Sequence, residues 1–113
     1  MHVPELKDKV VIVTGSARGI GQAIAERFAT EGSSVVLADL DNDGIKSVAE
    51  KIVTSGGSAV PIVTDVAIEE QVDALFDTTL DEYGTVDVLV NNAGLISPVK
   101  HILDVDNAWW DRL

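Results

Sequence analysis

Two kinds of hydrophobic pattern alternate along the chain. Four short runs rich in β-branched residues have the length of buried strands, and they cover Val10–Thr14, Ser34–Asp39, 59–65 and 86–91. Between these runs, apolar residues recur every three or four positions, which predicts three amphipathic helices. The predicted helix positions are Ile20, Ala23, Ile24 and Phe28, then Ile45, Val48, Ala49, Ile52 and Val53, then Ile68, Val72, Leu75, Phe76, Thr79 and Leu80.

The order of these elements predicts an α/β fold. Strands and helices in strict alternation, βαβαβαβ, predict right-handed crossovers and a Rossmann-type doubly wound parallel sheet, here incomplete. Pro61 lies in the third run. Because proline cannot donate to a strand ladder, this strand should lie at an edge. A strand order of 3-2-1-4 meets that condition. Glycines at 32, 56, 57 and 84 are typical stops for the three helices.

Composition excludes several classes of partner. The 113 residues include 19 acids and 8 bases, a formal net charge of -11 that disfavours nucleic-acid binding. No apolar run is long enough to span a membrane, and no basic amphipathic stretch suggests a membrane surface. There is no cysteine, so neither a disulfide framework nor a thiolate metal site is possible. The polar first eight residues do not resemble a signal peptide, so we expect a cytoplasmic protein.

A glycine-rich loop lies between the first strand and the first helix. It runs Thr14-Gly15-Ser16-Ala17-Arg18-Gly19-Ile20-Gly21. Bare backbone amides at a helix N-terminus bind phosphate, provided that no side chain is in the way. Gly15 permits the turn, Gly19 lets a diphosphate reach the backbone, and Gly21 lets the helix pack closely on the strand. We therefore predict a phosphate-binding loop, with a structural turn as the alternative.

Asp39 ends the second strand, 18 residues after Gly21. An acid at this position can accept hydrogen bonds from the hydroxyls of an adenosine ribose, and it would repel a 2′-phosphate. This favours NAD over NADP, although the positive charge of Arg18 weakly favours the opposite. Leu40, next to Asp39, belongs to the same predicted cofactor-binding set. The alternative for Asp39 is a solvated acid at the end of a strand.

A calcium motif overlaps this region. Residues 39–50 match the EF-hand pattern, with acids at 39, 41, 43 and 50 and a glycine at 44. An EF-hand loop lies between two helices, whereas the residues before Asp39 are predicted to form a strand. Lys46 also stands where an apolar residue is expected. The acids fit better at the start of a helix, where Asp41 and Asp43 complement the helix dipole.

Four motifs in the expected order resemble the short-chain dehydrogenase/reductase family. They are Thr14-Gly15-x-x-x-Gly19-x-Gly21, Asp65-Val66 after the third strand, Asn91-Asn92-Ala93-Gly94 after the fourth, and Trp110-Asp111-Arg112. The resemblance implies that Ser16, Arg18 and Ile20 line the phosphate loop and that Asp65 and Val66 contact adenine. It also implies that Asn92, Ala93 and Gly94 pass under the cofactor, while Asn91 braces the sheet. Ala67 departs from the family, where a Ser or Thr helix cap is usual.

The family's chemistry, which the resemblance implies, is hydride transfer between NAD(H) and an alcohol or carbonyl substrate. It uses a Tyr with a Lys four residues later, and it also needs a Ser and an Asn. The only Tyr is Tyr83, with Asp87 four residues on. An acid there raises the pKa of a phenol instead of lowering it. We therefore predict no catalytic residue in this chain, and read Tyr83 as a helix-end residue packing on the sheet.

We accordingly expect residues 1–113 to be the N-terminal part of a single NAD(P)-binding Rossmann domain that stops before the catalytic segment. The longer protein should be an oxidoreductase, and by resemblance a homo-oligomer. The sequence leaves two other functions open. One is a non-catalytic nucleotide-binding or regulatory module, and the other is calcium binding through residues 39–50.

Overall fold

The computed structural model describes residues 4–92. They form one four-stranded parallel sheet with the order β3-β2-β1-β4, which confirms the predicted fold class and strand order. The elements, in chain order, are η1 (Pro4–Leu6), β1 (Val10–Thr14), α1 (Gly19–Thr30), β2 (Ser34–Asp39), α2 (Asn42–Thr54), β3 (Ser58–Val63), α3 (Glu69–Tyr83) and β4 (Val88–Asn91). Pro61 lies in β3 at the edge of the sheet, as its missing amide donor requires.

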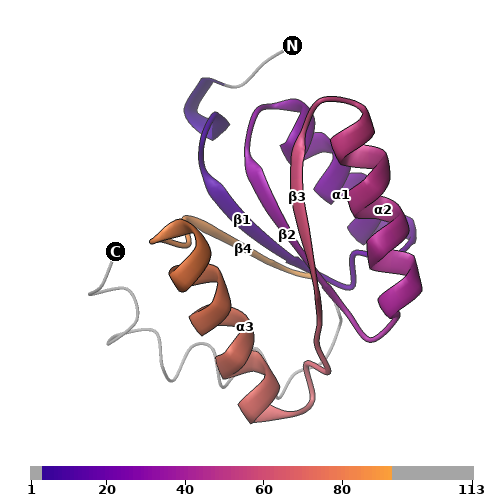
Figure 1. Cartoon of the computed structure of the whole chain (residues 1–113), viewed down its shortest axis with the longest axis vertical. Coiled ribbons are helices and arrows are strands. Elements are labelled where there is room, and N and C mark those ends of the chain that lie inside the picture. Colours follow the sequence, from indigo (N-terminus) through magenta and orange to yellow (C-terminus); the bar gives the residue numbers. More distant parts are fainter. Residues whose placement is uncertain (1–3, 93–113) are drawn as a thin grey trace.

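The sheet separates two hydrophobic layers, as Figure 1 shows, with α1 and α2 on one face and α3 on the other. Alternate residues of β1 and β2 point into each layer because successive side chains of a strand face opposite sides. The layer under α1 and α2 is built mainly of Val11, Val13, Val35, Leu37, Ile45, Val48 and Ile52. The layer under α3 is built of Ile12, Val36, Ala38, Val72, Leu75, Phe76 and Val86. Both strands are therefore buried on both faces, which explains their continuous apolar sequence.

The predicted buried face of α1 was wrong. The residues that α1 buries are Gly21, Ala25 and Ala29, and the larger Ile24 and Phe28 are only partly buried beside them. Ala23 is exposed, and 73% of the surface of Ile20 is exposed to solvent. Small residues let the helix axis approach the sheet closely, so the row of small side chains faces inward and the row of bulky ones lies at its flank.

The faces of α2 and α3 agree with the prediction except at their ends. Val53 is 56% exposed near the end of α2. Ile68 is 40% exposed and does not belong to a helix turn, since α3 begins at Glu69. The N-cap residue of α3 is Ile68, which makes no side-chain cap hydrogen bond, and Asp65 Oδ1 accepts the Ala67 amide at 2.9 Å ahead of the helix. The chain therefore makes a separate turn before α3 starts.

The ends of β3 and β4 also differ from the predicted runs. β3 covers Ser58–Val63, and β4 is shortened to Val88–Asn91. At the start of β4, the Asp87 carboxylate accepts the Val10 amide at 2.8 Å, and the Asp87 amide donates to the Val10 carbonyl at 2.9 Å. This side chain takes the place of a strand partner, which is why regular pairing starts one residue later.

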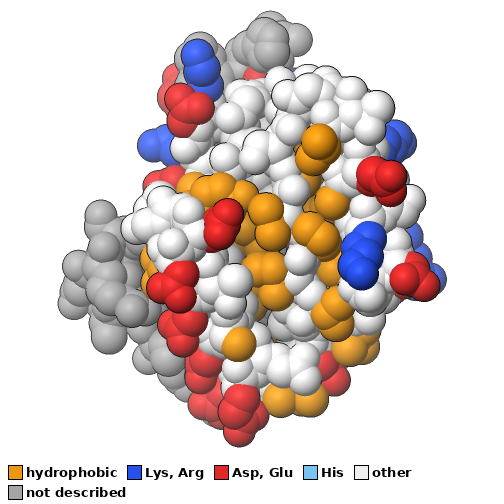
Figure 2. Space-filling model, viewed as in Figure 1, with side chains coloured by type: hydrophobic (Ala, Val, Ile, Leu, Met, Phe, Trp, Pro, Cys, Tyr) orange, Lys and Arg blue, Asp and Glu red, His pale blue; other side chains and the backbone are white. Residues whose placement is uncertain are grey.

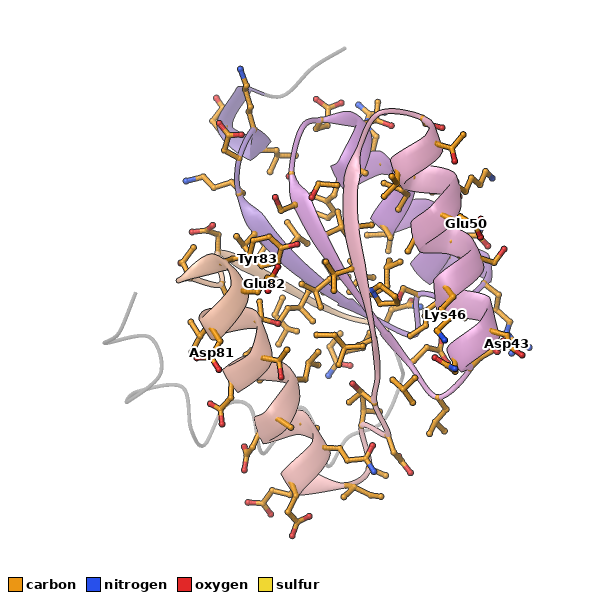
Figure 3. All side chains as sticks on the ribbon, viewed as in Figure 1. Asp43, Lys46, Glu50, Asp81, Glu82 and Tyr83 are labelled. Atoms are coloured by element: carbon orange, nitrogen blue, oxygen red, sulfur yellow. The ribbon has the colours of Figure 1, made fainter. Side chains whose placement is uncertain are left out.

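The predicted helix stops are confirmed. Gly32, Gly56 and Gly84 follow the three helices with φ of 93°, 95° and 80°, a left-handed conformation that glycine adopts without strain. Tyr83 ends α3 and packs at the edge of the layer beneath it, as predicted. Asp and Glu side chains lie along the outer surface of α3 in Figure 2, and Figure 3 shows Asp81 and Glu82 beside Tyr83 at its last turn. Within residues 4–92, every helix is too short or too polar to cross a bilayer.

Candidate nucleotide-binding site

The candidate site lies at the carboxyl ends of β1, β2 and β4. The chain leaves β1 toward β2 on one side, while β4 pairs with β1 on the other side. The connections therefore diverge next to β1, and in open α/β sheets such a switch point is where ligands bind. The structure brings three of the predicted segments together at this point, namely the glycine loop, Asp39 and Asn92.

The glycine loop has the backbone geometry that was predicted for phosphate binding. Gly15 and Gly19 have φ of 64° and 61°, so both adopt a conformation that favours glycine. Among residues 4–92, a methyl group added at Gly19 would meet no atom within 4 Å beyond its chain neighbours and its own helix, so the space beside its backbone is open there. The first amides of α1, which begins at Gly19, have no acceptor within the helix and lie at its positive end.

Gly21 is required for a different reason. A methyl group here would collide with the Gly15 carbonyl oxygen and would lie 2.6 Å from the Asn92 amide nitrogen. The first turn of α1 therefore packs directly on the backbone of the loop and on the residue after β4. This agrees with the predicted role of Gly21 in close packing between helix and strand.

Asn91 and Asn92 connect β4 to β1 through Thr14. The Thr14 hydroxyl donates to Asn91 Oδ1 at 3.1 Å and accepts from the Asn92 amide at 3.0 Å. Asn92 Nδ2 donates to the Gly15 carbonyl at 3.3 Å. Asn91 thus links β4 to β1, which is the bracing that the family resemblance implied. Thr14 was missed as a site residue, although it opens the glycine motif and a hydroxyl at that position could have been noticed.

Two buried polar atoms at the site lack a hydrogen-bond partner among the described residues. They are the Ser16 hydroxyl, in a side chain with no exposed surface, and Asn91 Nδ2. Buried polar groups are nearly always paired, which makes these two atoms exceptions within the described residues. The Ser16 side chain is fully buried, so its hydroxyl does not line the outer surface of the loop.

Asp39 is fixed by two backbone amides. Its Oδ2 accepts from the Ala17 amide at 3.1 Å, and its Oδ1 accepts from the Asp41 amide at 3.0 Å. The carboxylate therefore lies against the glycine loop and not in bulk solvent, which argues against the alternative of a merely solvated acid. Each carboxylate oxygen can accept more than one hydrogen bond, so Asp39 keeps capacity for two ribose hydroxyls.

Exposed apolar side chains occur on both sides of this carboxylate. Leu40 is 65% exposed beside Asp39, and Ile20 is 73% exposed at the start of α1. Val66 is partly buried against the layer under α3. Asp65 lies after β3, with one carboxylate oxygen engaged by Ala67.

The predicted positions Ala93, Gly94 and 110–112 lie outside the described residues.

The calcium alternative is not supported. Residues 39–50 do not form a loop between helices, since Asp39 ends β2 and α2 begins at Asn42. In Figure 3, Asp43, Lys46 and Glu50 lie along α2, and residues 4–92 contain no group of three acids or histidines close enough to hold a metal ion. A separate hollow of about 180 Å³ lies at the other end of α1 and α2, lined by Glu26, Lys51 and Ile52 among others.

A parallel sheet of this order, with a glycine loop leading from β1 into α1, defines a Rossmann-like α/β protein. Residues 9–113 match the family described as short chain dehydrogenase. The chain belongs to this family, which confirms the resemblance stated from the four motifs.

Similar proteins give the same result. Glucose 1-dehydrogenase 2 of Bacillus subtilis is 42% identical over 112 residues, which cover 96% of this chain and 43% of that protein. 3beta-hydroxysteroid dehydrogenase 1 of Eggerthella lenta is 45% identical over 92 residues, 80% of this chain and 35% of that protein. The chain thus spans less than half the length of these relatives.

Solved structures share the fold. A short chain dehydrogenase/reductase from Burkholderia phymatum in complex with NAD superimposes with a TM-score of 0.87 at 29% identity, covering 93% of this chain and 45% of that one. A 7 alpha-hydroxysteroid dehydrogenase complexed with NADH and 7-oxo glycochenodeoxycholic acid has a TM-score of 0.75 at 41% identity, covering 76% of this chain and 34% of that one.

Proposed function

We propose that this chain binds NAD at the carboxyl ends of β1, β2 and β4, as the cofactor-binding part of an oxidoreductase. The observation that carries the proposal is the open backbone at Gly19. Its φ of 61° and the empty space beside it leave the amides at the start of α1 accessible to a diphosphate. The neighbouring Asp39 carboxylate lies beside the loop, since it accepts the Ala17 amide at 3.1 Å.

The residues fit the parts of NAD in chain order. The diphosphate would lie over Gly15, Ser16, Arg18, Gly19, Ile20 and Gly21, with its charge facing the helix N-terminus. Asp39 would accept the ribose hydroxyls, Leu40, Asp65 and Val66 would hold adenine, and Asn92, Ala93 and Gly94 would lie under the cofactor. The preference for NAD over NADP follows from the Asp39 charge, which would repel a 2′-phosphate.

NAD, when bound, supplies a hydride acceptor, and the named relatives are dehydrogenases for a sugar and for steroids. We infer that the whole protein oxidises an alcohol or reduces a carbonyl. Tyr83 is not suited to acid–base catalysis, because burial raises the pKa of its phenol and a hydrogen bond with Ser58 offsets only part of this. It ends α3 on the face opposite α1, so we assign it a packing role.

The chain offers a matched pair of glycines for the test. Gly19 and Gly56 both have positive φ, and a methyl group at either would meet no non-local atom of the described residues within 4 Å. Gly19→Val and Gly56→Val should therefore lose comparable stability, since a branched side chain is strained in this conformation. Only Gly19→Val places a side chain over the proposed diphosphate site.

The measurement is calorimetric titration of the purified protein and both variants with NAD, with thermal unfolding alongside. Gly19→Val should reduce NAD affinity by about 100-fold or more, as expected when two or more charge-assisted hydrogen bonds are lost. Gly56→Val should bind NAD as the unmodified chain does. Equal NAD affinity in the two variants would contradict the proposed site.

A further inference from the structure

The glycine loop contains one basic side chain, Arg18, and its charge is already engaged. Arg18 Nη2 lies 3.2 Å from Asp41 Oδ2, and the two side chains are 80% and 39% exposed. No other partner of Arg18 is present in the described part of the chain. A free guanidinium in this loop would attract a phosphate, so its pairing bears on which dinucleotide the site accepts.

Asp41 is held firmly enough to act as a fixed partner. Its Oδ1 accepts the Gly44 amide at 2.9 Å, which caps the N-terminus of α2. Its own amide donates to Asp39 at 3.0 Å. A methyl group at Gly44 would lie 2.5 Å from Asp41 Oδ2, so the glycine leaves room for this carboxylate to turn toward the loop.

These contacts form a closed chain of interactions around the ribose position. The Ala17 amide binds Asp39, Asp39 binds the Asp41 amide, and the Asp41 carboxylate binds Arg18, the residue next to Ala17. Asp39 and Asp41 therefore place two negative charges beside the glycine loop. Arg18 is the one basic residue of that loop.

We propose that Asp41 is a specificity-determining residue, which keeps the Arg18 guanidinium from binding the 2′-phosphate of NADP. This rests on the proposed nucleotide site and adds a second residue to the selection against NADP. Asp39 acts by repelling the phosphate. Asp41 acts by pairing with the one basic side chain of the loop that could compensate for that repulsion, through a single contact between Arg18 Nη2 and Asp41 Oδ2.

The substitution Asp41→Asn isolates this effect. Asn caps a helix as well as Asp does, so α2 should keep its N-terminal hydrogen bond to Gly44. The side-chain amide that replaces the carboxylate can turn its NH2 group toward Arg18. The guanidinium then loses its anionic partner and is free to bind a phosphate. Because exposed ion pairs contribute little to stability, the unfolding midpoint should barely change. Asp43→Asn is the matched control, since it removes the same charge from the first turn of the same helix, where Arg18 is not bound.

The assay is titration of the purified protein with NAD and with NADP. Asp41→Asn should lower the Kd for NADP about tenfold, which corresponds to ~1.4 kcal/mol, and leave the Kd for NAD within about twofold. Asp43→Asn should leave the Kd for NADP near its original value. In the double variant Arg18→Gln, Asp41→Asn, the gain should disappear, because the guanidinium that binds the phosphate is gone.

Three results would overturn the inference. They are an unchanged Kd for NADP in Asp41→Asn, an equal gain in Asp43→Asn, and a gain that persists without Arg18. An equal gain in Asp43→Asn would show a general effect of net charge, and a gain that persists without Arg18 would show that Asp41 acts independently of the guanidinium. Failure of the proposed function is a separate outcome, because the unmodified chain would then bind neither NAD nor NADP.

Discussion

Gly21→Ala tests the packing on which the candidate site depends. In most exposed helix positions this change is stabilising, because alanine has the higher helix propensity. At Gly21 the added methyl group would collide with the Gly15 carbonyl, which is backbone and cannot rotate away. It would also lie 2.6 Å from the side-chain nitrogen Nδ2 of Asn92. The first turn of α1 would have to move away from the loop, or the loop from the sheet.

The size of the effect follows from two opposing contributions. Replacing glycine by alanine in a helix gains about 1 kcal/mol. Forcing a methyl group into a packed site costs about 1–3 kcal/mol, and contact with fixed backbone favours the upper end of this range. The free energy of unfolding should therefore fall by about 2 kcal/mol, or about 8 °C in Tm for a domain of this size.

Urea unfolding, followed by circular dichroism, measures this change. The reverse substitution Ala23→Gly, at an exposed position of the same helix, supplies the control. It should cost about 1 kcal/mol through helix propensity alone. NAD affinity should drop in Gly21→Ala and stay constant in Ala23→Gly, since only the former displaces the loop. If Gly21→Ala proved as stable as the original chain, the close packing of α1 on Gly15 would be refuted.

Two further predictions concern stability. Asp87→Ala removes the acceptor of the Val10 amide and should cost about 1–3 kcal/mol in urea unfolding, while Asp87→Asn keeps an acceptor and should cost less; equal losses would remove Asp87 from this role. A hydrogen bond from Gln22, together with Lys51, lowers the pKa of Glu26. Its carboxylate therefore adds stability above its unfolded-state pKa, and this is lost as the pH falls through the lower folded-state pKa. Glu26→Gln should lose less stability than the original chain on acidification, and an unchanged pH dependence would contradict the assignment.

The fold was predictable because its main signals are local. β-branched runs identified the four strands, and the doubly wound order 3-2-1-4 met the requirement of Pro61 for an edge strand. The orientation of α1 was not predictable from apolar periodicity. Its bulky row, Ile20 to Phe28, is the stronger hydrophobic signal, yet the helix buries Gly21, Ala25 and Ala29. The distance between helix and sheet decides this choice, and that distance depends on tertiary contacts such as Gly21 with Gly15.

The site was predictable at the level of motifs and not at the level of contacts. The glycine spacing and Asp39 followed from the chemistry of phosphate and ribose binding. The bond from Ala17 to Asp39 joins residues 22 positions apart, and the bonds from Thr14 to Asn91 and to Asn92 join residues 77 and 78 positions apart. Asp41 was interpreted as an acid that complements the helix dipole or belongs to the calcium motif, because nothing in the sequence shows that its side chain turns toward Arg18.

These long-range contacts hold the glycine loop in place through residues of the neighbouring strands. Gly15 donates its amide to Ala38 of β2 at 2.8 Å and accepts Asn92 Nδ2 after β4, so neighbouring strands hold it from both sides. Ala17 is held by Asp39. The loop is therefore positioned up to Ala17, and its open backbone begins at Gly19, where the amides of α1 start. A ligand that binds these amides need not order the loop first, which favours affinity by reducing the conformational entropy lost on binding.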